Sequence, residues 1–246
     1  MSVLTLRLAG PLQAWGASAR FVRRTTESAP TKSGVIGMLA AAKGIERGDD
    51  EALKPLAALR FGVRIDQPGT RLRDFQTAHH GITGKSMPLS ERFYLADAVF
   101  VAAVEGEPEL LAGLHAALRA PVYPPFLGRR SCPPAHPVEL GVHDGQDLLQ
   151  ALGQEPWQAS TWYRRQYRQE TVVMLPVLHE AGKDDTDPDV LRDQPLSFAA
   201  EHRRHSLRTV VRKEVAIPNP SAAIRRHTAP AVPRHDPFAA LEEESA

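Results

Sequence analysis

The order in which strand-forming and helix-forming segments alternate is the feature that most constrains this chain. Residues 3–8 alternate apolar and polar side chains, which predicts a strand, and the Ala- and Leu-rich run 35–42 predicts a helix. Residues 61–65 and 93–104 predict two further strands, and Pro108 opens a second helix with one apolar stripe. The order β, α, β, β, α is that of a ferredoxin-like fold. We therefore predict an α+β chain.

The segments outside this pattern predict a hairpin, a long loop and a second, smaller domain. Residues 67–90 are rich in Gly, Pro, Ser, Thr and His, so we expect a protruding loop or hairpin there. We place a first domain at 1–142, a smaller and mainly β domain at 143–217, and a flexible tail at 218–246. The remaining expected elements are helices at 49–59 and 146–152, a proline-punctuated loop at 121–137, and strands at 161–168, 171–178 and 209–217.

Composition excludes several classes of protein. Of the 246 residues, 42% are apolar and 24% charged, as in globular domains rather than disordered chains. The longest nearly apolar stretch, 35–42, is far shorter than the roughly 20 residues that cross a bilayer, so we expect no membrane contact. The first residues lack the pattern of a secretory signal. Cys132 is the only cysteine, so no internal disulfide forms, and the cytoplasm is the expected compartment.

The formal net charge is +1, but the charges are unevenly distributed. Residues 1–47 hold seven basic and two acidic groups, and residues 201–227 hold the same numbers, so each segment carries 7 − 2 = +5. Separated charge of this kind favours a polyanionic partner on one face, and ordinary solvated faces are the alternative.

The helix start at Pro30-Thr31-Lys32-Ser33-Gly34 has the features of an anion site. Free backbone N–H groups and the positive end of the helix dipole attract anions, and Lys32 adds a cation. The small residues Gly34 and Gly37 would let a phosphate approach closely. Alternatively, Thr31 or Ser33 caps a plain core helix that ends at Gly44.

Three further segments combine arginine, glycine and aromatic residues. The loop Gly128-Arg129-Arg130-Ser131 is flanked by prolines and suits bidentate phosphate contacts, unless its charges are merely solvated. Trp15, beside Gly16, could stack on a base or belong to the core. In the segment 162–168, aromatics and arginines interleave, which fits single-stranded RNA and a protein interface equally well.

Two other motifs, a P-loop and a histidine metal site, are incomplete in this sequence. The segment 79–86 ends like a P-loop, but His79 stands where that loop needs glycine. His202 and His205 could share a helix face, yet no cysteine or carboxylate cluster accompanies them. We therefore expect neither a metal nor a cofactor.

Four segments taken together resemble one family. They are Leu6 to Gly16, Pro30 to Gly34, Leu72-Arg73-Asp74-Phe75, and Tyr123 to Pro133. In this order, across about residues 4–142, they are similar to the CasD family of the RAMP superfamily, whose members are subunits of the type I-E CRISPR Cascade complex.

The resemblance implies a non-catalytic RNA-binding subunit with a ferredoxin-like domain and an inserted thumb hairpin at about 76–92. Such a subunit grips the 5′ handle of the CRISPR RNA (crRNA) and caps one end of the complex in antiviral defence. It contacts the repeated backbone subunit and the large subunit, and it meets target DNA only through the complex. The RNA-binding residues carried over are Gln13, Trp15, Gly16, Thr31, Lys32, Ser33, Gly34, Gly128, Arg129, Arg130 and Ser131, with Arg23 and Arg24 in a less well matched loop.

Two rival functions remain open. In a related subtype the homologous subunit is a metal-independent repeat endoribonuclease, for which Lys32, Tyr123 and His136 are the candidate groups here. The other rival is a protein adaptor whose basic faces meet acidic partners. The RNA hypothesis requires Lys32 and Arg129 to face the same side, with neither one neutralised by an internal carboxylate.

Overall fold

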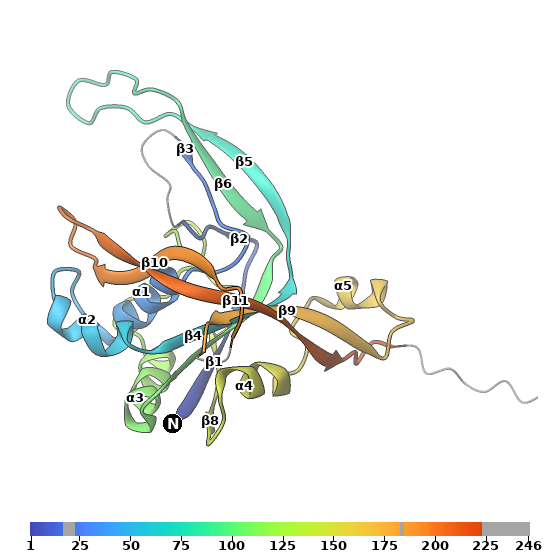
Figure 1. Ribbon diagram of the computed structural model, residues 1–246. Coiled ribbons are helices and arrows are strands. Elements are labelled where there is room, and N and C mark those ends of the chain that lie inside the picture. Colours follow the sequence, from blue (N-terminus) through green and yellow to red (C-terminus); the bar gives the residue numbers. More distant parts are fainter. Residues whose placement is uncertain (17–22, 183–184, 223–246) are drawn as a thin grey trace, which may run out of the picture.

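The computed structural model describes residues 1–16, 23–182 and 185–222. A seven-stranded sheet forms its centre, and every neighbouring pair of strands in it is antiparallel (Figure 1). In spatial order the strands are β10 (Asp189–Ser197), β11 (Arg204–Pro218), β9 (Val172–Glu180), β4 (Arg60–Gln67), β7 (Val99–Gly106), β1 (Ser2–Ala9) and β8 (Glu139–Asp144).

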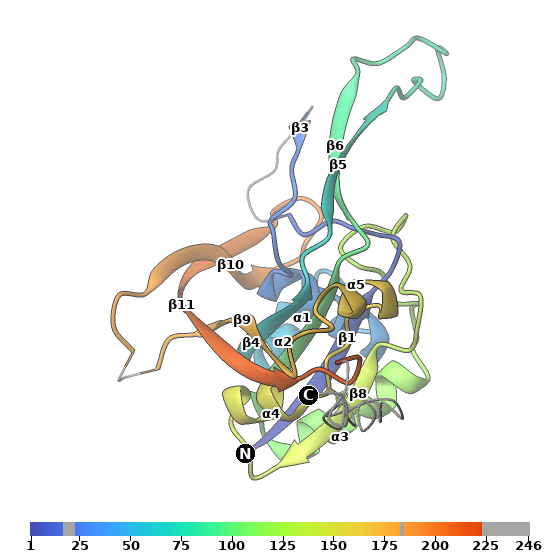
Figure 2. The same ribbon diagram turned by 90° about the vertical axis from the view of Figure 1, so that its right-hand side faces the viewer.

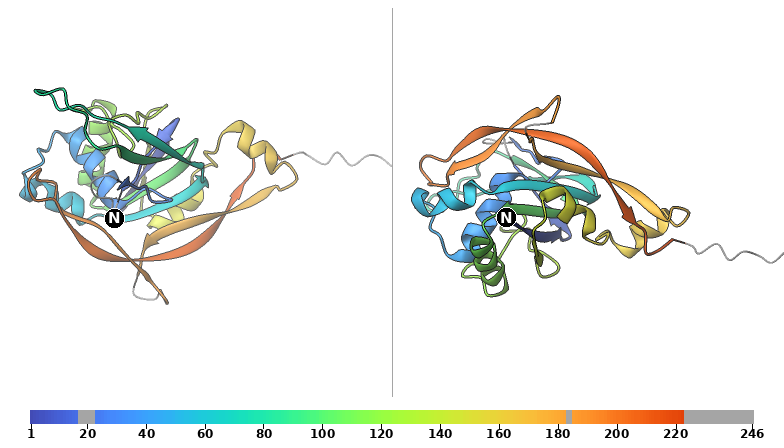
Figure 3. Two further views of the ribbon diagram at one scale, coloured as in Figure 1. Left: turned by 90° about the horizontal axis from the view of Figure 1, so that it is seen from above. Right: turned by 60° about the horizontal axis from the view of Figure 1, so that its bottom comes forward.

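Helices cover both faces of this sheet. On one face, α1 (Lys32–Lys43), α2 (Asp50–Ala57) and α3 (Pro108–Arg119) pack against the even-numbered residues of β1 in the largest apolar core. On the other face, α4 (Leu148–Gln154) packs on Val3, Val101 and Ala103. The short helix α5 (Thr161–Gln166) follows at the far end of the sheet from α1 (Figure 3). The mixed α and β composition is as predicted.

Local sequence explains α1. The Thr31 hydroxyl accepts the backbone N–H of Gly34 at 3.3 Å, which caps the start of the helix. Gly44 ends the helix in the left-handed conformation, with φ at 79°. Both predicted caps are confirmed.

A second, four-stranded sheet carries a long hairpin. It contains β2 (Leu12–Gln13), β3 (Arg23–Arg24), β5 (Thr70–Gln76) and β6 (Ser90–Ala96). The antiparallel pair β5 and β6 extends away from the main body, and the connection at 77–89 is exposed throughout (Figure 2).

Two predicted strands are wrong. The single strand at 93–104 is broken at Asp97, which has a φ of 55° and donates its N–H to the Pro11 carbonyl, so its halves join different sheets. The strand expected at 161–168 is the helix α5, because Tyr163 and Tyr167 lie four residues apart and pack on Trp157. Strands β8 and β10 were not predicted.

The main sheet crosses the predicted domain boundary at 142. Strand β9 pairs with β4 from Gly62 to Arg64, and β8 itself runs from residue 139 to 144. Most of the predicted tail, from residue 223 onward, lies outside the described residues. In the part of the chain that the structure describes, no helix is long and apolar enough to span a bilayer, and no three potential metal ligands cluster.

Candidate nucleic-acid interface

A cavity of about 950 Å³ brings several of the predicted site residues together. Its walls come from the loop after β2, from α1 and the connection between α1 and α2, from the loop 123–133, and from the connection between β10 and β11 with the start of β11. The predicted residues that line it are Trp15, Gly16, Thr31, Ser33, Gly34, Gly128 and Arg130. Segments distant in sequence therefore meet at one site, although neither Lys32 nor Arg129 belongs to its lining.

Backbone contacts anchor the arginine loop to the wall of this cavity. The Leu127 carbonyl accepts the N–H of Ala14 at 3.1 Å, and the Leu127 N–H donates to the Cys132 carbonyl at 2.7 Å. Gly128 has a φ of +82°, and a Cβ at that position would overlap the Ala14 carbonyl oxygen. Leu127 and Cys132 are fully buried, and burial raises the pKa of the Cys132 thiol. The loop is thus a rigid support.

The two arginines of this loop have different surroundings. The guanidinium of Arg129 lies 4.6 Å from the centroid of the Tyr94 ring, and its Nη2 donates to the Arg24 carbonyl at 2.9 Å. Arg129 therefore ties the loop to the second sheet. Arg130 and Ser131 are exposed, and Arg130 lines the cavity.

Gln13 and Trp15 have their polar groups satisfied internally. The Gln13 amide donates to the carbonyls of Leu8 and Ala98 at 3.0 and 2.7 Å, and its oxygen accepts the Trp15 indole N–H. Trp15 is 0% exposed. Gly34 packs so closely on the Trp15 ring that an added Cβ would lie 2.8 Å from it, so this position requires glycine. Trp15 therefore forms the floor of the cavity, whereas Gln13 does not belong to the lining, and its contact with RNA stays a prediction. Gly16 is exposed at the rim.

The predicted anion site at the start of α1 is already occupied. The backbone N–H of Lys32 donates to Asp193 Oδ2 at 2.8 Å, so a carboxylate from β10 fills the position expected for a phosphate. The Lys32 ammonium lies 2.7 Å from Glu180 and the residue is 2% exposed. Burial lowers the pKa of Lys32, against the opposing effect of the Glu180 carboxylate. The expectation that Lys32 and Arg129 hold the RNA together is therefore wrong, because internal carboxylates neutralise Lys32 and the start of α1.

Thr31 and Ser33 are buried beside Lys32, and the Ser33 hydroxyl lies 3.5 Å from that of Thr31. Both side chains belong to the start of α1, and both also line the cavity. The plain N-cap, which the sequence left open as an alternative, describes this turn better than an anion site does.

Arg23 and Arg24 lie outside the cavity. They form β3, which pairs in parallel with β6, and both are exposed. Arg23 lies 3.8 Å from the Glu91 carboxylate and 5.3 Å from the centroid of the Phe93 ring.

Three unpaired arginines surround the cavity instead. Arg47, Arg130 and Arg203 are exposed, line the cavity, and form no ion pair within the described ranges, while Glu46 is the only acidic group in the lining. Arg47 and Arg203 were missed as site residues, although the basic segments 1–47 and 201–227 signalled the excess charge.

The connection between β10 and β11 and the start of β11 add aromatic groups to the wall. Phe198 and His205 approach with ring centroids 6.4 Å apart, and Gly37 faces the Phe198 ring. Burial lowers the pKa of His205, and Arg203 lowers it further. A cavity with cations at its rim and flat rings inside it can hold a phosphate chain and a base at once.

Comparison with known proteins identifies the family. The model of the family described as CRISPR-associated protein (Cas_Cas5) matches residues 3–211. The chain belongs to this CRISPR-associated family. The Cascade subunit CasD of Escherichia coli strain K12 is 38% identical over 169 residues, which is 61% of this chain and 75% of that relative.

Solved structures of Cas proteins have the same fold. A chain of a CRISPR RNA-guided surveillance complex is 34% identical with a TM-score of 0.71, covering 92% of this chain and 95% of that one. A crystal structure of a Cas protein, also 34% identical, has a TM-score of 0.64 over 89% of this chain and 97% of that one.

Proposed function

We propose that this family member is a non-catalytic Cascade subunit that grips the 5′ handle of crRNA in the cavity described above. The observation that carries the proposal is that three unpaired arginines line one cavity of about 950 Å³. Arg47, Arg130 and Arg203 would neutralise phosphates, while splayed bases and 2′-hydroxyls would provide selectivity for RNA.

The relatives support the assignment to such a complex. CasD is a Cascade subunit, and the chain with a TM-score of 0.71 belongs to an RNA-guided surveillance complex. By analogy, this chain would contact the repeated backbone subunit and the large subunit, cap one end of the assembly, and reach target DNA only through it.

The arrangement of the elements supports the finer fold proposal. Four neighbouring strands of the main sheet lie in the spatial order β8, β1, β7, β4, which are the fourth, first, third and second of the four along the chain. Helices α1 and α2 follow the first of these strands in sequence, and α3 follows the third. That is the order of a ferredoxin-like domain. The hairpin of β5 and β6 is inserted between the second and third of these strands and would be the thumb. The divisions at 142 and 217 remain proposals.

The geometry favours binding over RNA cleavage. Metal-independent cleavage needs a base near the 2′-oxygen and a proton donor for the leaving group. Tyr123 is 54% exposed and lines the cavity, but neither Lys32 nor His136 belongs to its lining. Lys32 is also held by Glu180. Incubating the full chain with repeat RNA in EDTA tests the alternative, since a discrete product lost in His136→Ala would favour the enzyme.

Photo-crosslinking to a repeat-derived RNA tests the proposed site directly. We expect crosslinked peptides from residues 123–131 and 198–205, which form two walls of the cavity. Crosslinks confined to α3 and α4 would overturn the proposal. Assembly with partner subunits that survives complete RNase digestion of the crRNA handle would favour the adaptor hypothesis instead.

A further inference from the structure

A short segment around α5 presents cations and an aromatic ring that the proposed function does not use. Residues 156–169 contain three arginines and no acidic residue, and they are flanked by Glu155, which is buried, and Glu170, which is exposed. Trp162 is 53% exposed, and Arg165 and Arg168 are exposed. In the described parts of the chain, none of the three arginines forms an ion pair. We call Trp162, Arg165 and Arg168 the α5 platform.

An aromatic cluster supports the platform from below. Trp157 is buried, and its ring packs edge-on against Tyr163 and Tyr167 at centroid distances of 6.2 and 5.6 Å. The two tyrosine hydroxyls lie 3.2 Å apart. Trp162 meets Tyr163 edge-to-face at 5.7 Å and 89°. The edge contact orients the Trp162 ring, and more than half of the residue remains open to solvent.

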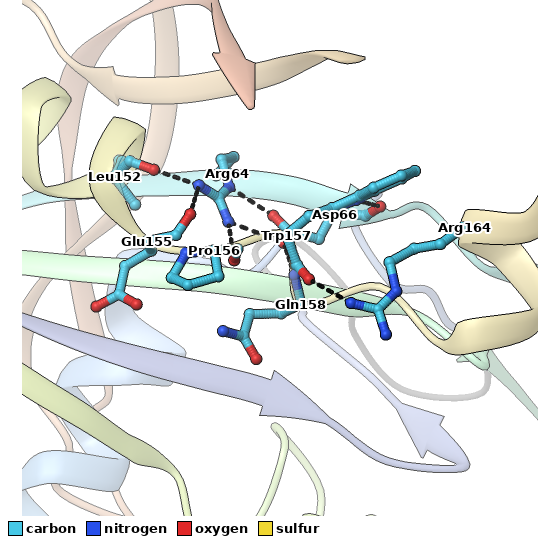
Figure 4. Close-up of polar contacts among 8 residues, drawn as sticks. All are labelled: Arg64, Asp66, Leu152, Glu155, Pro156, Trp157, Gln158 and Arg164. Atoms are coloured by element: carbon cyan, nitrogen blue, oxygen red, sulfur yellow. Dashed lines mark hydrogen bonds and ion pairs between the residues drawn. The ribbon is translucent and has the colours of Figure 1, made fainter. Parts of the chain in front are cut away.

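A buried ion pair fixes the segment that leads into α5 (Figure 4). Arg64 and Asp66 on β4 form a bidentate pair with distances of 2.7 and 2.9 Å, and both side chains are 0% exposed. Asp66 also accepts the N–H of Gln158 at 2.6 Å, and its carbonyl accepts the Trp157 indole N–H.

Arg64 uses its remaining donors on the same segment. It donates to the carbonyls of Leu152, Glu155 and Pro156, the latter two at 2.7 and 2.9 Å (Figure 4). The bonds to Glu155 and Pro156 fix the coil between α4 and α5, and the bond to Leu152 fixes the end of α4. Ser160, at the start of α5, donates twice to Gln67. A coil held by this many buried bonds is rigid, so it presents the platform in a fixed geometry.

The other end of the platform is fixed by Asn219. Its side-chain amide donates to the carbonyls of Tyr167 and Glu170 at 2.9 and 3.0 Å, and its backbone N–H donates to Thr171. Residues 155–171 are thus anchored at both ends. They lie at the opposite end of the sheet from α1 and α2, and so away from the cavity (Figures 1 and 3).

We propose that the α5 platform is a second binding surface for a single-stranded polynucleotide, distinct from the handle cavity. Trp162 would stack on one base, and Arg165 and Arg168 would each neutralise a phosphate. Within residues 156–169, Trp162 is the only exposed large apolar side chain. The next ones along the chain, Val172 and Met174, alternate on β9 with Val173 and Leu175, which pack with Trp157, so they face away from the α5 segment. A protein interface needs a broader apolar core, which this segment lacks, so a polynucleotide fits better than an acidic protein.

Tryptophan fluorescence tests the proposal, because Trp15 and Trp157 are buried and Trp162 is exposed. The full chain carrying Arg130→Ala and Arg203→Ala, which weaken the handle cavity, is titrated with oligo(U) and oligo(dT). We expect quenching by at least one oligonucleotide. Variants at position 162 lack this reporter, so their affinity is measured by the fluorescence anisotropy of a labelled oligonucleotide, with the parent chain measured in the same way. Trp162→Ala should lower the affinity about tenfold, as expected for losing one stacked base, while Trp162→Phe retains most of it.

The arginines are tested by the salt dependence of the same titration. Arg165→Ala with Arg168→Ala should reduce the slope of log affinity against log salt by about 1.4, from about 0.7 per phosphate on single strands. Arg212→Ala, exposed on β11, is the matched control and should leave this slope unchanged.

Several results would overturn the platform. The proposal is wrong if Trp162→Ala leaves the affinity for the oligonucleotides unchanged, or if Arg165→Ala with Arg168→Ala leaves the slope of log affinity against log salt unchanged. It is also wrong if the protein binds polyglutamate as tightly as both oligonucleotides. A preference between oligo(U) and oligo(dT) supports the site and identifies RNA or DNA as the strand. None of these results depends on whether the cavity binds the handle.

Discussion

The Asp193 carboxylate accepts the backbone N–H of Lys32, the first residue of α1, across 161 residues of sequence and at a distance of 2.8 Å. The same carboxylate pairs with Arg208 on β11 through bonds of 2.6 and 2.9 Å. It therefore joins the helix start to the C-terminal strands, and both of these elements contribute residues to the wall of the cavity.

Removal of this carboxylate should destabilise the protein strongly. Asp193→Ala leaves the nearly buried Arg208 and the Lys32 N–H without their acceptor, so we expect a loss of about 3–5 kcal/mol in the free energy of unfolding. Denaturant unfolding measures it. Asp189→Ala, at an exposed position on the same strand, is the control and should have little effect. Equal losses in the two variants would contradict the role given to Asp193.

Gly128→Ala should damage both stability and RNA binding. A side chain at a φ of +82° costs about 1–3 kcal/mol, and here the added Cβ also overlaps the Ala14 carbonyl. Displacement of the loop would move Arg130 as well. The matched control is Gly113→Ala in α3, where a Cβ meets open space and should stabilise the helix by up to about 1 kcal/mol. Wild-type thermal stability in Gly128→Ala would contradict the anchored loop.

His205 should make stability depend on pH. Burial and Arg203 lower its pKa in the folded protein, against the opposing effect of Asp193, from the ordinary value of 6.5. The unfolded chain therefore takes up the proton first as pH falls below about 6.5, and the protein loses stability from there downward until the folded pKa is passed. The test is chemical unfolding at about pH 7.5 and about pH 5.5.

The variant His205→Gln should lose less stability than the wild type between these two pH values. His202→Gln, three residues away and exposed, should keep the wild-type dependence. The account of His205 fails if all three proteins show the same change.

Features set by neighbouring residues were predictable from the sequence. Thr31 and Gly44 act within one turn of α1, so its caps could be predicted from residue types alone. The buried stripe of α3, with Leu111, Leu114 and Leu118, follows from periodicity in the same way.

Features set by distant residues were not predictable. The carboxylates that neutralise the start of α1 lie 148 and 161 residues away in sequence, and no local pattern connects Glu180 or Asp193 with Lys32. The segment 161–168 is rich in strand formers, but its tyrosines pack on Trp157, and tertiary contact overrides propensity there. Asp97 interrupts a nearly continuous apolar run at a φ of 55°, a backbone conformation that aspartate adopts more readily than most residues, but the apolar residues on both sides favoured one unbroken strand.

The salt dependence of binding to a 5′-handle RNA tests the central claim most directly. For the full chain, the double variant Arg130→Ala with Arg203→Ala should bind more weakly and reduce the slope of log affinity against log salt by about 1.4. The paired control, Arg119→Ala with Arg212→Ala, removes two exposed charges outside the cavity and should leave affinity and slope near the wild-type values. An unchanged slope in the cavity variant, or the same reduction in both, would contradict the assignment of the cavity as the handle site.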